Sequence, residues 1–319
     1  MPDAGPVPQS IPQGVSADGS VVVGYNQDSI NVRTAWRWTS ALGYQAIAPT
    51  AGVTRSDAFA VSANGQTIVG QVATGALPNV FVWTAGNGAV TLPVTTGSGP
   101  IISADGSTVA GSQVSGTPFL WTAGGGVQNM NSLPDALNLF PAAITSDGSI
   151  IFGSANDASN TSFLFRYENG VMTSLGAPLA PPNTIASVGL SGATADGALL
   201  VGNQFLADGT TGVPIGASAW IWTSVDGFAS IDDVFASNGI DLGNFNILSV
   251  DGISPDGTTF YGQGVLDGNL SISTWVAIVP EPSYIPSGLA MLAAVAFRRR
   301  GKLRGPEGAN LSSLFGSAG

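Results

Sequence analysis

The 20 Asp and Glu side chains hold most of the chemistry open to this 319-residue chain, because it contains no His and no Cys. Without His, a serine–histidine–aspartate triad cannot form within the chain. Without Cys, disulfides and thiolate metal sites are excluded. A serine–lysine pair is disfavoured, because the single lysine, Lys302, lies near the end of the chain. We therefore assign no catalytic residues.

Six Asp or Asn residues recur, each followed by Gly, and they invite a calcium hypothesis: Asp18, Asn64, Asp105, Asp147, Asp196 and Asp256. A Ca²⁺ site needs about six to eight converging oxygen ligands, whereas the spacing puts one such residue in each repeat, apart from the others. Glycoside hydrolysis needs two carboxyl groups about 5–10 Å apart, and adjacent Asp232 and Asp233 would point to opposite faces of a strand. We predict that the six residues form turns, with no metal and no cofactor.

The six residues belong to one repeated segment, SADGSVVVG at 16–24. It returns as SANGQTIVG at 62–70, SADGSTVAG at 103–111, TSDGSIIFG at 145–153, TADGALLVG at 194–202 and SPDGTTFYG at 254–262. The residue types fit a type I turn followed by glycine in the left-handed region, leading into a strand. The closing glycine of each segment indicates a close approach of two backbones.

A second segment follows each first one: AWRWT at 35–39, VFVWT at 80–84, PFLWT at 118–122, SFLFR at 162–166, AWIWT at 219–223 and STWVA at 273–277. Alternating aromatics indicate a strand with one face in a core. Tryptophans also stack on sugars, but their recurrence at one place per repeat favours core packing. With about four strands in roughly 40–60 residues, each repeat has the content of a propeller blade. The sequence predicts an all-β β-propeller of about six four-stranded blades, with a β-solenoid as the alternative.

Charge is sparse and unevenly placed. Residues 1–279 carry 4 Arg, no Lys and 18 Asp or Glu, whereas residues 280–319 carry 5 basic and 2 acidic residues. A body this acidic repels phosphate backbones, so nucleic acid is not an expected partner.

With both segments in view, residues 13–278 resemble the HAF-repeat family of extracellular bacterial proteins. That family pairs a turn segment like SADGSVVVG with a strand segment like VFVWTAGNGAVTLP or SFLFRYENGVMTSLG. The family's His is replaced here, for example by Asn79-Val80. The resemblance implies a surface or secreted repeat protein rather than a reaction.

Residues 279–301 resemble the PEP-CTERM sorting signal. Pro280-Glu281-Pro282, the apolar stretch Ile285–Phe297 and the basic cluster Arg298-Arg299-Arg300 occur in the family's order. We expect the apolar stretch to be a short helix, with the arginines held on the cytoplasmic side of a membrane. The resemblance implies export, transient membrane anchoring and cleavage by an exosortase-type processing enzyme, in proteins linked to exopolysaccharide or biofilm matrix.

The two ends of the chain complete the expected domain organisation. Residues 1–12 form an N-terminal extension and a candidate closing strand of the propeller, residues 279–301 the sorting segment, and residues 302–319 a disordered tail. The N-terminal MPDAGPVPQSIPQG has no basic region followed by an apolar core, as a signal peptide has. We expect the true start to lie upstream of Met1.

Three functional hypotheses follow. The first is a non-enzymatic protein at the cell surface or in the extracellular matrix that binds glycan or protein through propeller loops. The second is an extracellular polysaccharide-active hydrolase or lyase that uses carboxylates of the propeller channel. The third is a cytosolic scaffold, which the N-terminus permits and the C-terminal segment disfavours.

Overall fold

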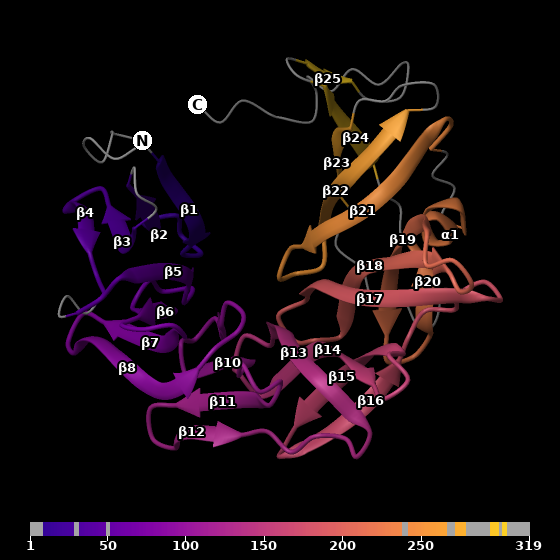
Figure 1. Ribbon diagram of the computed structural model, residues 1–319. Helices are drawn as coiled ribbons and strands as arrows, with labels where there is room; N and C mark the ends of the chain where they lie inside the picture. The colour runs from indigo at the N-terminus through magenta and orange to yellow at the C-terminus, as the bar shows by residue number, and fades with distance from the viewer. Residues whose placement is uncertain are drawn as a thin grey trace. The chain divides into compact units, whose positions relative to one another are not determined.

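The computed structural model of the protein describes residues 9–28, 32–48, 52–237, 242–266 and 272–278, and the backbone of 294–299 and 302–304. Within these residues antiparallel strands form six sheets, and α1 (Ile231–Ser237) is the one helix of this described part (Figure 1). The chain divides into two compact units, Met1–Gly176 and Ala177–Gly319.

The first unit contains four sheets of four strands each. They are β1 (Gln9–Val15), β2 (Val21–Gln27), β3 (Arg33–Thr39) and β4 (Gly43–Ala46); β5 (Arg55–Val61), β6 (Thr67–Ala73), β7 (Asn79–Thr84) and β8 (Gly88–Thr95); β9 (Ile101–Ile102), β10 (Thr108–Ser112), β11 (Pro118–Thr122) and β12 (Gly126–Asn129); and β13 (Ala136–Ile144), β14 (Ile150–Asp157), β15 (Ser162–Glu168) and β16 (Val171–Gly176).

The second unit contains two sheets, of four and five strands. They are β17 (Thr184–Ala193), β18 (Leu199–Asp208), β19 (Pro214–Thr223) and β20 (Gly227–Ser230); and β21 (Phe245–Ile253), β22 (Thr259–Leu266), β23 (Ser273–Ile278), β24 (Ala294–Arg299) and β25 (Lys302–Arg304). In every sheet the strands are neighbours in sequence order, as the repeated turns predict.

The hydrophobic core lies between successive sheets of each unit. In the first unit Val23 and Ala35 of the first sheet pack with Ala58 and Ile68 of the second. Equivalent clusters join the second sheet to the third and the third to the fourth. In the second unit one cluster joins its two sheets and includes Phe235 of α1. Face-to-face packing of four-stranded sheets is the arrangement of neighbouring propeller blades.

The first strand of five sheets carries a register shift three residues before the repeat turn. The unpaired residues are Gln13, Phe59, Ala142, Ser191 and Asp251. An extra residue on one strand bends that strand and increases its twist. The five bulge positions share no residue type, so the repeated segments do not predict this bulge.

Both ends of the chain depart from the expectations. Gln9–Val15 is β1 and pairs with β2 as the first strand of its own sheet, so residues 9–12 are no closing strand. Residues 294–297 lie in strand β24 rather than in the predicted helix, and residues 302–304 of the predicted tail form β25. The backbone of β24 pairs with β23, from Thr274 opposite Arg298 to Ile278 opposite Ala294, and so supplies the fourth strand that the last repeat lacks.

A membrane span was a second expectation for the C-terminal segment. Among the residues that the structure describes, no helix has the length and apolar character needed to cross a bilayer.

Candidate functional site

Each repeat turn is closed by a hydroxyl that bonds to a carboxylate or amide two residues later. In the first copy Ser16 Oγ donates to Asp18 Oδ1 at 2.7 Å and accepts from the Val21 backbone N–H at 3.0 Å. Gly19 follows Asp18 with a φ of 72°, which confirms the predicted left-handed glycine. The same pair recurs in the other copies as Ser62 with Asn64, Ser103 with Asp105, Thr145 with Asp147, Thr194 with Asp196, and Ser254 with Asp256.

These hydrogen bonds lower the pKa of the turn carboxylates. The Ser16 hydroxyl is the main group that lowers the pKa of Asp18 to about 2, and the Ser149 backbone N–H does the same for Asp147. At Asp105 burial raises the pKa, but hydrogen bonds from its own turn outweigh burial and the pKa is lowered. Hydrogen bonds also lower the pKa of Asp196 and Asp256. A carboxylate with a lowered pKa is a poor general acid, so these residues serve the turns.

Neighbouring turns contact each other, contrary to the expectation that they lie apart. The Ala17 N–H donates to Ala63 O at 3.0 Å, and the Ala63 N–H donates to Ala104 O at 2.8 Å. Further along the chain, Asp105 N–H donates to Ser146 O and Ala195 N–H donates to Pro255 O. In the part of the chain that the structure describes, no three acidic side chains come together as a possible metal site.

The closing glycine of each turn segment lies under an aromatic ring of the next strand. The cross-strand pairs are Gly24–Trp36, Gly70–Phe81, Gly111–Phe119, Gly153–Phe165, Gly202–Trp220 and Gly262–Trp275. An added Cβ at any of these glycines would collide with the ring. The rings of Trp36, Trp220 and Trp275 are buried, which confirms core packing for these three tryptophans.

This pairing corrects the alignment of the second segment in two copies. In the fourth copy the residue equivalent to Trp36 is Phe165, so the segment is shifted by two residues from 162–166 to 164–168. In the sixth copy it is Trp275, which shifts the segment by one residue to 274–278.

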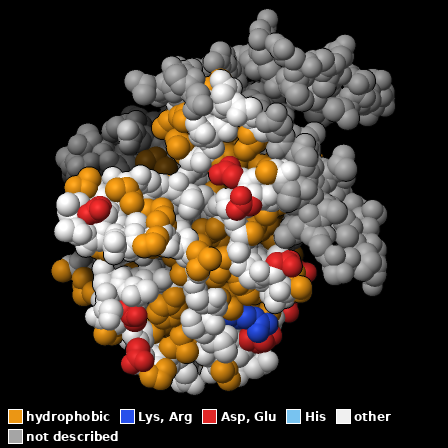
Figure 2. Space-filling view, turned by 90° about the vertical axis from the view of Figure 1, so that its right-hand side faces the viewer, with side chains coloured by type: hydrophobic (Ala, Val, Ile, Leu, Met, Phe, Trp, Pro, Cys, Tyr) orange, Lys and Arg blue, Asp and Glu red, His pale blue; other side chains and the backbone are white. Residues whose placement is uncertain are grey.

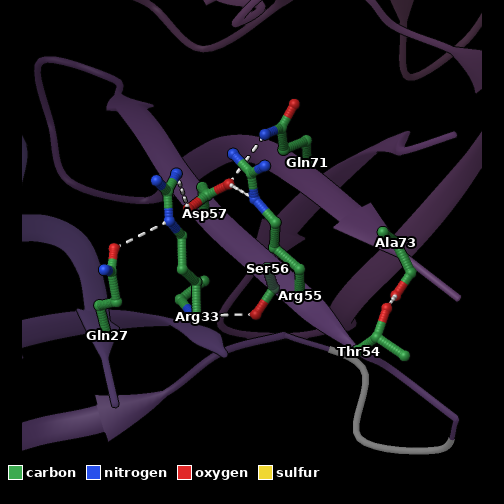
Figure 3. Close-up of polar contacts among 9 residues, drawn as sticks. Gln27, Arg33, Thr54, Arg55, Ser56, Asp57, Gln71 and Ala73 are labelled. Carbon is green, nitrogen blue, oxygen red and sulfur yellow. Dashed lines mark hydrogen bonds and ion pairs between the residues drawn. The ribbon is translucent and has the colours of Figure 1, made fainter. Parts of the chain in front are cut away.

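A buried carboxylate lies between the first and second sheets, at the end of the sheets opposite the repeat turns. The side chain of Asp57, on β5, is 0% exposed. Its Oδ1 lies 3.4 Å from Arg33 Nη1, and its Oδ2 accepts at 2.8 Å from Arg55 Nε and at 2.8 Å from Gln71 Nε2 (Figure 3). Three donors and two positive charges compensate the cost of burying this carboxylate.

Strand geometry brings these side chains together. Arg55 and Asp57 are two residues apart on β5 and therefore share one face, and Gln71 is the cross-strand partner of Asp57 on β6. Arg33 reaches across from β3 of the first sheet. The adjacent Ser56 Oγ accepts from the Ala35 backbone N–H at 2.9 Å, which adds a second polar link between the two sheets (Figure 3).

Both guanidinium groups are fixed yet open to solvent, with side chains 29% exposed for Arg33 and 44% for Arg55. Arg33 Nε donates to Gln27 Oε1 at 3.2 Å, and its guanidinium carbon lies 4.6 Å from the centre of the Tyr25 ring. Arg55 is held through Nε alone, and its terminal nitrogens meet no acceptor among the described residues. Two arginines and one aspartate leave a net charge of +1 in this cluster.

The positions of the arginines in the sequence indicate this cluster, although none of the sequence predictions included it. Three of the four arginines of residues 1–279 fall between positions 33 and 55. The third, Arg37, also faces the second sheet, where its guanidinium lies 4.6 Å from the Trp83 ring. On the face drawn in Figure 2, the described acidic side chains are scattered and basic ones occur at one place beside acidic atoms.

The structure describes the predicted sorting residues only in part. Pro280, Glu281, Pro282, Ile285 and Arg300 lie outside the described residues, and Phe297, Arg298 and Arg299 are described only as backbone of β24. The prediction of a sorting signal therefore stays a prediction.

Comparison with known proteins shows the fold. No protein-family model and no curated protein match the chain. The β-propeller domain of the Trilobed protease from Pyrococcus furiosus is similar at 8% identity with a TM-score of 0.51, over 93% of this chain and 94% of that chain. The oligogalacturonate lyase from Vibrio parahaemolyticus is similar at 11% identity with a TM-score of 0.52, over 84% and 76%.

A prolyl endopeptidase is similar at 11% identity with a TM-score of 0.54, over 90% of this chain and 46% of the endopeptidase. The chain therefore spans about half the length of that protein. At such low identities the likeness shows the fold alone. The β-propeller fold predicted from the repeats is confirmed, and no activity is transferred.

Proposed function

We propose that the chain is a non-enzymatic, exported propeller protein that binds glycan or protein at the cell surface or in the extracellular matrix. The observation that carries this proposal is the contrast between the two ends of the sheets. Within each unit, one end of the sheets carries nearly identical turns, and backbone hydrogen bonds join neighbouring turns. The other end carries dissimilar loops and the arginine cluster around Asp57.

The loops between second and third strands show this contrast. Each connects the second strand of a sheet to the third and has four to six residues, but their sequences are unrelated: 28–32 DSINV, 74–78 TGALP, 113–117 QVSGT, 158–161 ASNT, 209–213 GTTGV and 267–272 DGNLSI. Dissimilar loops on a rigid, repeated scaffold are typical of binding surfaces. The repeat turns, by contrast, keep one sequence because each position has a fixed structural task.

The proposal that the protein is exported depends on the C-terminal segment. Its resemblance to a sorting signal supports passage across a membrane, transient anchoring through the apolar stretch, and cleavage by an exosortase-type enzyme near Pro280-Glu281-Pro282. Cleavage there would remove β24 and β25, so the last sheet of the mature protein would keep β21, β22 and β23. The mature protein then stays at the surface or enters the matrix, where glycans and surface proteins are its partners.

Cell fractionation and binding test the two halves of this proposal. We expect the native chain in the envelope or medium, with a C-terminus near residue 281 by mass spectrometry. We also expect the full chain to bind polysaccharide extracted from the same cells by isothermal titration calorimetry. A cytosolic chain that ends at Gly319 and does not bind this material would overturn the proposal.

The same mixtures test the enzymatic alternative. A hydrolase or lyase would release new reducing ends or unsaturated products from the polysaccharide over time. Product release that an Asp→Asn variant abolishes would replace the binding function by catalysis. Unchanged polymer after prolonged incubation agrees with the proposed function.

A further inference from the structure

We infer that Arg33 and Arg55, held in place by Asp57, form a binding subsite for the carboxylate of an acidic sugar. This inference rests on the proposed function, since it names the class of glycan that the binding end would take. It follows from the arrangement of donors, from charge and from the polarity of the surroundings.

The donors of the subsite are oriented before any ligand arrives. Arg33 is fixed by Asp57, Gln27 and the Tyr25 ring, and Arg55 by its Nε bond to Asp57. A guanidinium has five N–H donors in a planar fork that matches a carboxylate. Arg55 donates to Asp57 through Nε. The two terminal nitrogens of its guanidinium group are therefore available to donate to a second carboxylate. Fixing the donors in advance lowers the entropic cost of binding.

The charge of the cluster favours one anionic group. The two guanidinium groups exceed the single buried carboxylate by one positive charge. Asp57 is fully buried and already accepts three bonds, two of them from the guanidinium groups whose charges offset its repulsion of an anion. Residues 1–279, with 18 acidic and 4 basic side chains, repel long polyanions. A short oligosaccharide with few carboxylates fits these conditions better than a highly charged polymer.

The described side chains around the two guanidinium groups are mostly polar. Gln71, which is buried, gives its amide nitrogen to Asp57, and its amide oxygen points away from the carboxylate in Figure 3. The Tyr25 ring, which Arg33 contacts, is buried. Hydroxyl-rich sugars fit these polar surroundings better than apolar peptide side chains, although Val32, directly before Arg33, is 38% exposed.

Calorimetry with the full chain and trigalacturonate at 0.15 M salt tests the subsite, with the trimethyl ester of the same sugar as the uncharged control. We expect the acid to bind and the ester to bind at least about tenfold more weakly, because charge-assisted hydrogen bonds are lost. Arg55→Gln and Arg33→Gln are expected to weaken binding of the acid at least about tenfold as well. Arg166→Gln, on the fourth sheet, removes the same charge and should leave binding unchanged.

Several outcomes would overturn the subsite while the proposed function stands. They are equal binding of acid and ester, unchanged affinity in Arg55→Gln, and equal loss in Arg166→Gln. An acidic peptide that binds as tightly as the sugar would overturn the ligand class. Arg55→Gln also removes one of the two charges that compensate the buried Asp57, so we expect a lower thermal unfolding midpoint. Calorimetry well below that midpoint separates lost binding from lost fold. Loss of export and of all matrix binding would overturn the proposed function itself.

Discussion

Gly202 on β18 lies directly opposite Trp220 on β19, and a Cβ at Gly202 would overlap with both the indole ring and the carbonyl oxygen of Gly189. The backbone and the ring thus occupy the space of the missing side chain. The contact with the ring recurs in all six sheets, and the contact with a backbone carbonyl oxygen recurs in every sheet except that of Gly111. The ring contact explains why the closing glycine follows every repeat turn.

Gly202→Ala should therefore be strongly destabilising. Overpacking a well-packed core typically costs about 1–3 kcal/mol, and here backbone must also move, so we expect a loss of at least about 2 kcal/mol in the free energy of unfolding. Gly216→Ala on β19 is the matched control, because an added Cβ there meets no atom within 4 Å. Equal unfolding free energies of the two variants in urea would contradict this account of the glycine.

Ser103 provides a test of the turn hydroxyl. Its buried Oγ donates to Asp105 and accepts from the Thr108 backbone N–H at 3.0 Å, so Ser103→Ala leaves both groups without this partner. By analogy with lost helix caps and buried hydrogen bonds we expect a loss of about 1–2 kcal/mol. Ser107→Ala, at the exposed end of the same turn, should change stability by under about 0.5 kcal/mol. A Ser103→Ala variant as stable as Ser107→Ala would show that the hydroxyl is dispensable.

Stability should fall in acid because the turn carboxylates have lowered pKa values. A carboxyl group with a lower pKa in the folded chain stabilises it above the ordinary value of 3.8, and this contribution is lost as the pH falls toward about 2. We expect a thermal midpoint that changes little above about pH 5 and decreases between pH 4 and pH 2.

Asp147→Asn checks the source of this acid sensitivity. The amide cannot be protonated in this range, and Asn64 shows that an amide oxygen accepts the same turn bonds. The variant should keep its midpoint at pH 7 and lose less of it between pH 4 and pH 2. A curve parallel to that of the natural chain would assign the acid sensitivity to other groups.

Much of the fold was predictable because its determinants are local. A left-handed glycine after Asp or Asn and an aromatic opposite a glycine each act within about 20 residues, so a repeated sequence exposes them. The turn hydroxyl was equally visible, since Ser or Thr stands two residues before Asp or Asn in all six copies, but we considered only the Asp–Gly pair.

The features that could not be predicted depend on distant residues. Arg33 and Asp57 are 24 residues apart, belong to no repeated segment, and meet only because two sheets pack face to face. Residues 294–297 have the composition of a short helix, yet the free edge of β23 offers backbone bonds to a strand. Tertiary context of this kind overrides local propensity.

Asp57→Ala tests whether the buried carboxylate fastens the first two sheets. The substitution leaves the Arg33 and Arg55 guanidinium groups without their shared counter-charge and Gln71 Nε2 without its acceptor. Removing one partner of a buried ion pair costs about 3–5 kcal/mol. Because both arginines are partly exposed, we expect a loss of about 3 kcal/mol in the free energy of unfolding. Glu168→Ala is the matched control, because it breaks the partly exposed pair with Arg166 at 2.9 Å, which should cost under about 1 kcal/mol. Urea unfolding of both variants at pH 7 measures the difference, and an Asp57→Ala variant no less stable than Glu168→Ala would remove the carboxylate from the contacts that hold these sheets together.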